Sequence, residues 1–282
     1  MSRKSCLSAL CMIVLISLFS PGCVKKNKTI VEISGSQTME PLLAALAESY
    51  QKSHAASVAI HATGSLKGFT CLVEGKCDIA ASSVKMPAQQ VWDAQKKGLV
   101  LKEVIIGYDI ITPIVHPSNQ QKNLFLGQLG DMYTGLIKDW KGVEGRPGSI
   151  IVVDREDDSG TRLLMNERFF EAKTIVDKAI KTKSDKEVVS YVAKHPTAVG
   201  YVSKRSCDAS VRPVNINGFS ATLENVEKGY YPLYREIYLY VNEKSYKVDV
   251  KAFMDFALNK SGQDLIEKSG FIPLARLNKA GQ

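Results

Sequence analysis

The stretch T-I-V-E-I-S-G-S-Q-T-M-E-P-L-L, residues 29–43, predicts a strand, a turn and the start of a helix in direct succession. Residues 29–34 alternate apolar and polar side chains, as a half-buried β-strand does. Gly35 to Thr38 follow as a turn, and Pro41 stands where the first turn of a helix tolerates proline. The stretch therefore predicts the first strand–turn–helix unit of an α/β fold.

The same order of elements recurs further along the chain. Residues 57–62 predict a second strand, T-G-S at 63–65 predicts a turn, and an apolar stripe at helical spacing follows to Val73. Residues 78–81 predict a short buried strand that ends at the pair Ser82 and Ser83. This alternation indicates βαβ units and a mostly parallel sheet.

Two longer β-rich segments, residues 104–116 and 236–242, stand apart from this alternation. We interpret them as crossovers between two lobes, because further α/β elements lie between them and helices follow the second one. These elements are helices at 126–132, 161–170 and 186–193, strands at 150–153 and 199–202, a turn at 154–159, and later helices at 250–258 and 262–268. The sequence thus predicts lobe I from residues 23–106 with 236–282, lobe II from residues 107–235, and a cleft between them.

Residues 1–22 have the pattern of a signal peptide: the basic pair Arg3 and Lys4, a mostly apolar stretch at 7–19 and small residues before Cys23. The apolar stretch is shorter than the roughly 20 residues of a transmembrane helix. The site resembles a bacterial lipobox, with Ser20 where leucine is usual. We expect lipidation of Cys23 and export to the periplasm or the outer face of the membrane, held by the lipid anchor only. An ordinary signal peptide is the alternative.

The charge of the chain fits an anion better than a nucleic acid. The formal net charge is +8 and falls to +6 without Arg3 and Lys4. Such a mixed surface mildly favours attraction of an anion. No dense run of basic residues interleaved with aromatic ones is present in the sequence, so nucleic-acid binding is not expected.

The cysteines and histidines do not form a metal-binding pattern. Cys71 and Cys77 are six positions apart, which is wider than the usual spacing of paired zinc ligands. A disulfide between them is possible in an oxidising compartment, and the sequence leaves this open. The four histidines lie away from the cysteines in the sequence, so we expect neither a metal site nor a cofactor.

Three turns share one kind of chemistry: residues 35–38, 64–65 and 158–161 each follow a strand and open a helix. Hydroxyl side chains can cap such helices, and the free backbone N–H groups at a helix start attract an anion. Arg155, just before the third turn, can fork two N–H bonds onto an oxyanion. The alternatives are ordinary helix caps and a surface ion pair of Arg155 with residues 156–158.

Six segments, in chain order, carry a family resemblance. They are I-S-G-S-Q-T-M-E-P-L (33–42), A-T-G-S-L-K-G-F-T-C-L-V-E-G-K-C-D-I-A-A-S-S (62–83), M-Y-T-G-L-I-K-D-W (132–140), V-V-D-R-E-D-D-S-G-T (152–161), V-G-Y-V-S (199–203) and Y-P-L-Y-R-E-I-Y-L-Y-V (231–241). Together they resemble the periplasmic phosphate-binding proteins of ABC transporters, over essentially all of the chain after residue 22.

The resemblance implies a two-lobed type II periplasmic-binding-protein fold that closes on phosphate and delivers it, as a monomer, to an ABC permease. Carried over residue by residue, the implied ligand contacts are Thr38, Ser65, Arg155, Ser159, Gly160 and Thr161. Ser36, Gln37 and Ser83 stand at positions where the family also places contacts. Arg155 would supply positive charge, and the hydroxyls and amides would supply hydrogen bonds.

The sequence departs from the family pattern at three positions. Ser83 stands where the family has an acidic residue that accepts a proton from phosphate and so discriminates against sulfate. Other branches carry an arginine one residue later, where this chain has Val84. Gln37 replaces the usual hydroxyl. Anion binding is therefore the firmer expectation, and another tetrahedral oxyanion is the alternative to phosphate.

Two further classes of function compete with transport. An enzyme would need a base beside Ser159 or a cluster of Asp and His metal ligands, and the sequence marks neither, so we expect no catalysis. A surface lipoprotein that senses phosphate without serving a permease would have the same binding residues. The sequence does not separate sensing from transport.

Overall fold

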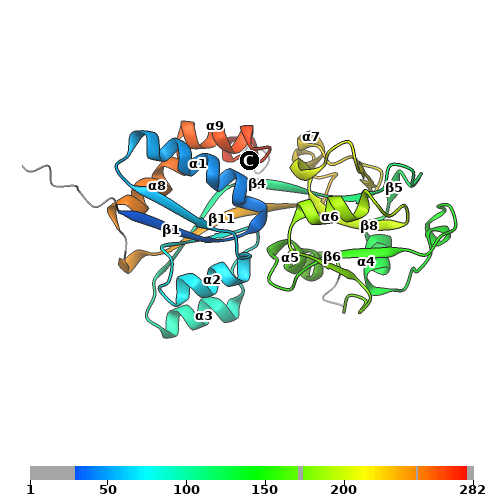
Figure 1. Ribbon diagram of the computed structural model, residues 1–282, viewed down its shortest axis with the longest axis horizontal. Coiled ribbons are helices and arrows are strands. Elements are labelled where there is room, and N and C mark those ends of the chain that lie inside the picture. The colour runs from blue at the N-terminus through cyan, green and yellow to red at the C-terminus, as the bar shows by residue number, and fades with distance from the viewer. Residues whose placement is uncertain (1–28, 171–173, 246, 278–282) are drawn as a thin grey trace, which may run out of the picture.

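The computed structural model describes residues 29–170, 174–245 and 247–277. A ten-stranded sheet runs through these residues in the strand order β2-β1-β3-β11-β4-β8-β6-β7, with β9 and β12 also paired to β4. Figure 1 shows two lobes lying side by side, with helices around each part of the sheet. The predicted signal peptide and Cys23 lie outside the described residues.

Lobe I contains the first three strands, the helices that connect them and the helices near the C-terminus. Its strands are β1 (Ile30–Gly35), β2 (Ser57–His61), β3 (Ile79–Ser82) and β12 (Ile272–Pro273). Its helices are η1 (Gln37–Met39), α1 (Glu40–Ser53), α2 (Ser65–Val73), α3 (Ala88–Lys96), η4 (Glu243–Ser245), α8 (Val248–Leu258), α9 (Lys260–Lys268) and α10 (Leu274–Leu277). As predicted, β1 pairs in parallel with both β2 and β3.

Lobe II repeats this α/β arrangement on the other side of the molecule. Its strands are β5 (Asn123–Leu124), β6 (Ile151–Arg155), β7 (Ile180–Thr182), β8 (Ala198–Ser203), β9 (Arg212–Pro213) and β10 (Asn215–Ile216). Its helices are α4 (Leu126–Thr134), η2 (Trp140–Val143), α5 (Gly160–Arg168), α6 (Asp185–Val192), η3 (Lys204–Ser206) and α7 (Leu223–Glu227). Parallel pairing of β6 with β7 and β8 brings the ends of these strands to one edge.

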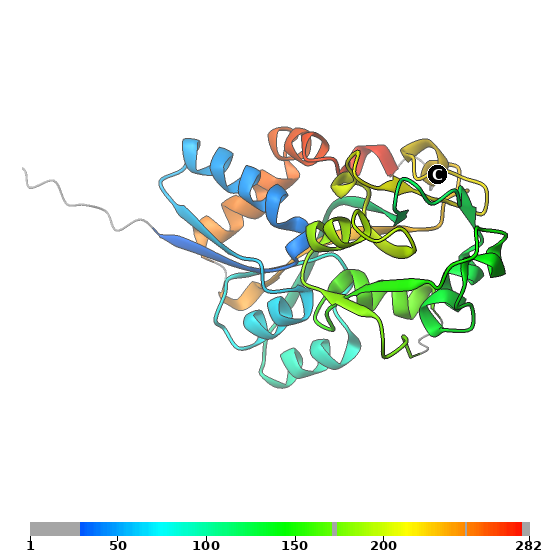
Figure 2. The same cartoon turned by 45° about the vertical axis from the view of Figure 1, so that its right-hand side comes forward.

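Two long antiparallel strands, β4 (Leu101–Val115) and β11 (Tyr234–Asn242), connect the lobes. Figure 2 shows both strands passing through the middle of the molecule. In lobe I, β11 pairs with β3, whereas in lobe II the second half of β4 pairs with β8. The predicted crossover segments are thus confirmed, and with them the two-lobed fold.

The core of lobe I explains why α1 forms where it does. Its buried residues include Leu42, Leu43, Leu46 and Tyr50, which repeat at the spacing of one helix face. Tyr50 contacts the edge of Phe253 from α8, with ring centroids 5.3 Å apart. Burying such a face is worth about 25 cal/mol per Å² of apolar surface, so the stripe fixes α1 and α8 over the sheet.

No helix among the described residues is both long enough and apolar enough to cross a membrane. The longest described helix, α1, has 14 residues.

Candidate functional site

The three hydroxyl-bearing turns meet between the lobes. The backbone N–H of Leu66, at the start of α2 in lobe I, donates to the carbonyl oxygen of Asp158 in lobe II over 3.3 Å. Lys67 also forms an ion pair with the Asp158 carboxylate at 2.6 Å. Because these contacts join the two lobes directly, the cleft between them is closed in this structure.

Three serine hydroxyls form the lobe I side of the site. Ser36 follows β1, Ser65 opens α2 and Ser83 follows β3, and each is at most 3% exposed. The Ser36 hydroxyl donates to Ser83 Oγ over 3.1 Å, and the Ser83 backbone N–H points to Ser65 Oγ at 3.4 Å. The parallel order of β1 and β3 brings these turns to the same sheet edge, so hydroxyls far apart in sequence become neighbours.

Gly160 lies directly against these serines from the other lobe. A Cβ at this position would overlap Ser65 Oγ and lie 2.9 Å from Ser83 Oγ. Only glycine therefore allows the start of α5 to approach α2 this closely. The S-G-T segment is thus shaped for contact between the lobes.

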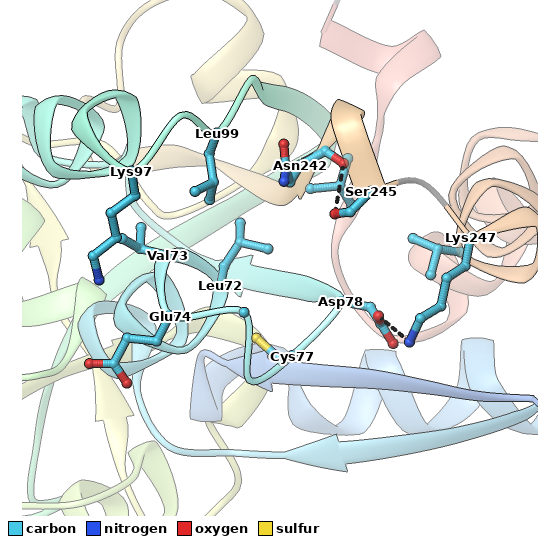
Figure 3. A pocket seen from close by; sticks show the side chains of 13 residues that line it. Leu72, Val73, Glu74, Cys77, Asp78, Lys97, Leu99, Asn242, Ser245 and Lys247 are labelled. Atoms are coloured by element: carbon cyan, nitrogen blue, oxygen red, sulfur yellow. Dashed lines mark hydrogen bonds and ion pairs between the residues drawn. The ribbon is translucent and has the colours of Figure 1, made fainter.

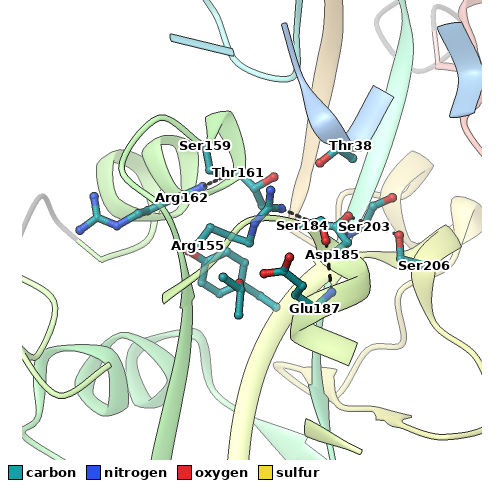
Figure 4. Close-up of polar contacts among 12 residues, drawn as sticks. Thr38, Arg155, Ser159, Thr161, Arg162, Ser184, Asp185, Glu187, Ser203 and Ser206 are labelled. Atoms are coloured by element: carbon teal, nitrogen blue, oxygen red, sulfur yellow. Dashed lines mark hydrogen bonds and ion pairs between the residues drawn. The ribbon is translucent and has the colours of Figure 1, made fainter. Parts of the chain in front are cut away.

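Arg155 ends β6 and is 1% exposed. It forms an ion pair with Asp185, the first residue of α6, and donates to the carbonyl oxygen of Lys183 over 2.8 Å. Figure 4 shows its side chain directed at Asp185, with Thr161 beside it and Thr38 on the facing lobe. The interpretation of Arg155 as a surface ion pair with residues 156–158 is therefore wrong, because the side chain is buried and its partner is Asp185.

The Nε–H group of Arg155 is buried and has no hydrogen-bond partner among the described residues. Buried donors in proteins nearly always have an acceptor, and an unpaired donor costs more when it belongs to a charged group such as this guanidinium. An anion would supply such an acceptor. This orphaned donor is the feature of the site that points most directly to a ligand.

Ser159 and Thr161 flank Gly160 and are both buried. Ser159 caps α5, since its Oγ accepts from the backbone N–H of Arg162 at 3.4 Å. Thr161 Oγ1 accepts from a guanidinium N–H of Arg235 at 2.8 Å. In both cases the hydroxyl oxygen accepts, so each O–H remains available to donate.

Thr38 and Gln37 occupy η1, the single turn between β1 and α1. Thr38 is 4% exposed, and its carbonyl oxygen accepts a hydrogen bond from Arg205 of lobe II. Gln37 is half-buried. The Arg205 bond to Thr38 therefore brings the turn that holds Gln37 and Thr38 against lobe II.

Buried charged side chains that no local sequence pattern marks lie beneath these turns. Arg235 of β11 donates two hydrogen bonds to Asp109 of β4, at 3.0 and 2.7 Å, and the Ser203 hydroxyl donates to the other Asp109 oxygen at 2.5 Å. Burial raises the pKa of Asp109, and Arg235 and Ser203 oppose this rise. Arg235 lies within the sixth family-like segment, which was the only signal for it in the sequence.

Three guanidinium groups and two carboxylates make up the charge cluster beneath these turns, so this cluster has one more cation than anions. Arg155, Arg205 and Arg235 face the carboxylates of Asp109 and Asp185. A partly desolvated cation without a carboxylate partner attracts a bound anion more strongly than a solvent-exposed cation does. Among the described residues there is no group of three or more metal-ligating side chains.

A separate hollow of about 490 Å³ opens on lobe I, between the end of α2 and the start of α8. Figure 3 shows Leu72, Val73 and Leu99 among its lining side chains, and Lys247 pairs there with Asp78 at 2.7 Å. Cys77 lines this hollow, and Cys71, Cys77 and Cys207 are free thiols in the structure. None of the predicted ligand residues lines it.

Comparison with known proteins agrees with this geometry. Residues 24–261 match the model of the PBP superfamily domain. The phosphate-binding protein PstS of Borreliella burgdorferi is 27% identical over 278 residues, which cover 93% of this chain and 98% of that protein. An ABC-type phosphate transport receptor of Vibrio cholerae has a similar structure, with a TM-score of 0.74 and 28% identity over 86% of this chain and 99% of that one.

A crystal structure from Clostridium perfringens is also similar, with a TM-score of 0.81 and 34% identity over 87% of this chain and 100% of that one. That crystal structure contains bound phosphate. The superfamily match covers both lobes and the crossovers between them, and the similarity to this structure spans the full length of the relative. The chain therefore belongs to the PBP superfamily and, within it, to the PstS-like substrate-binding proteins.

Proposed function

We propose that this protein captures inorganic phosphate in the cleft between its lobes and delivers it to the permease of an ABC transporter. The observation that carries the proposal is the buried Arg155, whose unpaired Nε–H lies beside hydroxyl-bearing turns from both lobes. The relatives support it, because they include a phosphate-binding protein, an ABC-type phosphate transport receptor and a crystal structure with bound phosphate.

Each lobe would contribute a different kind of contact. Lobe I would offer the hydroxyls and amides of Ser36, Gln37, Thr38, Ser65 and Ser83. Lobe II would offer the Arg155 guanidinium together with Ser159, Gly160 and Thr161. α2 and α5 both begin where the lobes meet, since Leu66 at the start of α2 donates to Asp158 just before α5, and a helix N-terminus favours a bound anion. Because each lobe holds only part of this set, full binding requires closure.

Binding rather than catalysis is supported by the surroundings of Ser159. Its Oγ is engaged by the Arg162 backbone, and the four histidines have their partners elsewhere: His54 and Tyr50, His61 and Glu32, His116 and Ser118, and His195 and Tyr191. A nucleophilic serine needs a base within hydrogen-bond reach. We therefore propose a binding protein without enzymatic activity.

The selectivity of the cleft between anions depends on the side chain at position 83. Ser83 can accept or donate a hydrogen bond, whereas a carboxylate only accepts. A serine therefore imposes no need for a protonated ligand. Another tetrahedral oxyanion is the competing ligand, and sulfate is the informative one because it carries no proton at neutral pH.

The delivery and anchoring of the protein complete the proposal. Residues 1–22 would direct export, and lipid on Cys23 would hold a monomer at the membrane.

We also propose the lobe boundaries predicted from the sequence, at 106/107 and 235/236, since both fall within the connecting strands β4 and β11. A sensor that uses the same cleft without a permease is the alternative, and co-purification with membrane permease subunits distinguishes the two.

Calorimetric titration tests the ligand directly. Purified protein is titrated with phosphate, sulfate, arsenate and molybdate, and we expect tight, stoichiometric binding of phosphate. Arg155→Ala should abolish most of this binding, whereas Arg146→Ala, which removes the same charge from an exposed position of lobe II, should not. Failure of all four anions to bind, or normal binding by Arg155→Ala, contradicts the proposal.

A further inference from the structure

Arg205 reaches from lobe II to residues 35–38 of lobe I, which are named the anion turn after their proposed role. It lies in η3, immediately after β8, and its guanidinium donates to the carbonyl oxygen of Thr38 in η1. The same guanidinium lies over the ring of Phe271, 4.9 Å from the ring centroid. Its stem packs on Gly270, where a Cβ would come within 2.9 Å of Arg205 Cβ. A single side chain of lobe II therefore has its contacts at two separate segments of lobe I.

This contact differs from the ion pair that Lys67 forms with Asp158. Lys67, which pairs with Asp158 at the rim, has a side chain that is 66% exposed, and exposed ion pairs contribute little. Arg205 has a buried Nε–H that lacks a partner among the described residues, as Arg155 does. A partly desolvated guanidinium bonded across the cleft is a stronger determinant of closure.

Arg205 also belongs electrostatically to the charge cluster of the site. Burial lowers its pKa, Asp109 and Asp185 oppose this effect, and Arg235 adds to it. Asp185 is the carboxylate that holds Arg155. An anion added between the lobes would therefore stabilise both guanidinium groups at once, one in the floor of lobe II and one across the cleft.

The bond from Arg205 joins two lobes, so separation of the lobes would break it. Thr38 belongs to the turn that the proposed function assigns to anion binding, and opening of the cleft would separate its carbonyl oxygen from η3. A contact present in one state and absent in the other shifts the equilibrium between them. We propose that Arg205 is a positioning residue that couples occupancy of the anion turn to closure of the lobes and so slows release of the ligand; this rests on the proposed function.

Release and capture rates separate this role from simple charge attraction. Radiolabelled phosphate is bound to the purified protein, release is followed after a chase with unlabelled phosphate, and calorimetry gives Kd. We expect Arg205→Ala to release phosphate about tenfold faster with an unchanged association rate, because loss of a contact made after encounter acts on dissociation. A general loss of positive charge would instead lower the association rate and make it less dependent on salt.

Arg212→Ala is the matched control. Arg212 also donates from its guanidinium to backbone carbonyl oxygens, those of Asn119 and Gln121, but all three residues lie in lobe II. Its loss should lower the melting temperature without changing the release rate. Arg205→Lys keeps the charge and the packed stem, so it should recover part of the slow release and serves if the alanine variant does not fold.

The outcomes distinguish this inference from the proposed function. If the wild-type protein binds phosphate and Arg205→Ala releases it at the wild-type rate, the coupling role is wrong and the proposed function stands. If the wild-type protein binds no phosphate, the proposed function fails. Hydrogen exchange of the unliganded proteins then decides whether Arg205 holds the two lobes together. Faster exchange around Thr38 in Arg205→Ala, but not in Arg212→Ala, would support the tie between the lobes, and equal exchange would contradict it.

Discussion

Arg155 and Asp185 form a buried ion pair that joins the end of β6 to the first residue of α6. Asp185 also accepts from the Ser203 backbone N–H at 3.2 Å and from the Ser206 hydroxyl at 3.3 Å. One carboxylate thus fixes both the Arg155 guanidinium and the chain on either side of Arg205. The pair holds a cation in the floor of the site before any ligand arrives.

Removal of this carboxylate should make stability depend on the ligand. In Asp185→Asn the Arg155 charge stays buried without its partner, and breaking such a pair costs about 3–5 kcal/mol. A bound anion would offset part of that cost. We therefore expect a lower melting temperature than wild type without phosphate, and a larger increase on addition of saturating phosphate. An equal increase in both proteins would show that Asp185 and the anion do not share Arg155.

Gly160→Ala should prevent full closure. The new Cβ would overlap Ser65 Oγ and crowd Ser83 Oγ, so the lobes could approach only after a backbone shift, and crowding of this kind costs about 1–3 kcal/mol. Phosphate affinity should fall by about tenfold or more, since 1.4 kcal/mol corresponds to a factor of ten. Calorimetry measures this loss.

Gly127→Ala in α4 is the control for that substitution. Nothing lies within 4 Å of a Cβ at Gly127, and alanine is the better helix former, so stability should rise slightly and affinity should not change. Equal affinities for the Gly160 and Gly127 variants would mean that the close approach at Gly160 is not needed for binding.

The strongly patterned parts of the fold could be predicted from sequence. β1, α1, β4 and β11 carry long apolar runs or stripes, and the structure has them within a few residues of the predicted positions. α3 was not predicted, because Ala94 is its only buried residue and a helix with so little apolar surface has no clear period. Strands of two residues, such as β5 and β12, are too short to carry a pattern.

In the anion site, too, only residues that belong to a local sequence pattern could be predicted. Residues 36–38 and 159–161 stand out because glycine and hydroxyl residues between a strand and a helix have a local physical meaning. The roles of Asp109, Arg205 and Arg235 depend on approach between elements that are distant in sequence, and no local pattern marks them. Asp185 likewise becomes the partner of Arg155 only because β6 and α6 lie side by side.

Acid should destabilise the protein in part through Asp139. The backbone N–H groups of Lys141 and Gly148 donate to its carboxylate at 2.9 and 3.2 Å and lower its pKa below the ordinary value. A carboxylate with a lowered folded-state pKa stabilises the fold above its unfolded pKa of about 3.9, and this contribution is lost as pH falls through the folded pKa.

Asp139→Asn tests the assignment, because the amide oxygen can still accept both bonds but cannot titrate. The free energy of unfolding in urea should be higher for wild type at pH 7, and the two proteins should converge as the pH falls below the folded-state pKa of Asp139. A difference that is the same at pH 7 and pH 3 would contradict the titration of this residue.

Ser83→Asp should change the selectivity of the cleft rather than its general affinity. A carboxylate at this buried position can accept a hydrogen bond from a protonated phosphate, but it repels sulfate, which has no proton to donate. We expect sulfate affinity to fall at least about tenfold more than phosphate affinity, since an unpaired contact between like charges costs more than about 1.4 kcal/mol in a desolvated site.

Ser83→Asn is the control, because asparagine has the size of aspartate without its charge. It separates crowding against Gly160 and Ser36 from electrostatic discrimination between the anions. Calorimetric competition between the two anions measures the ratio, and an equal loss for both anions in the aspartate variant would mean that residue 83 does not face the ligand.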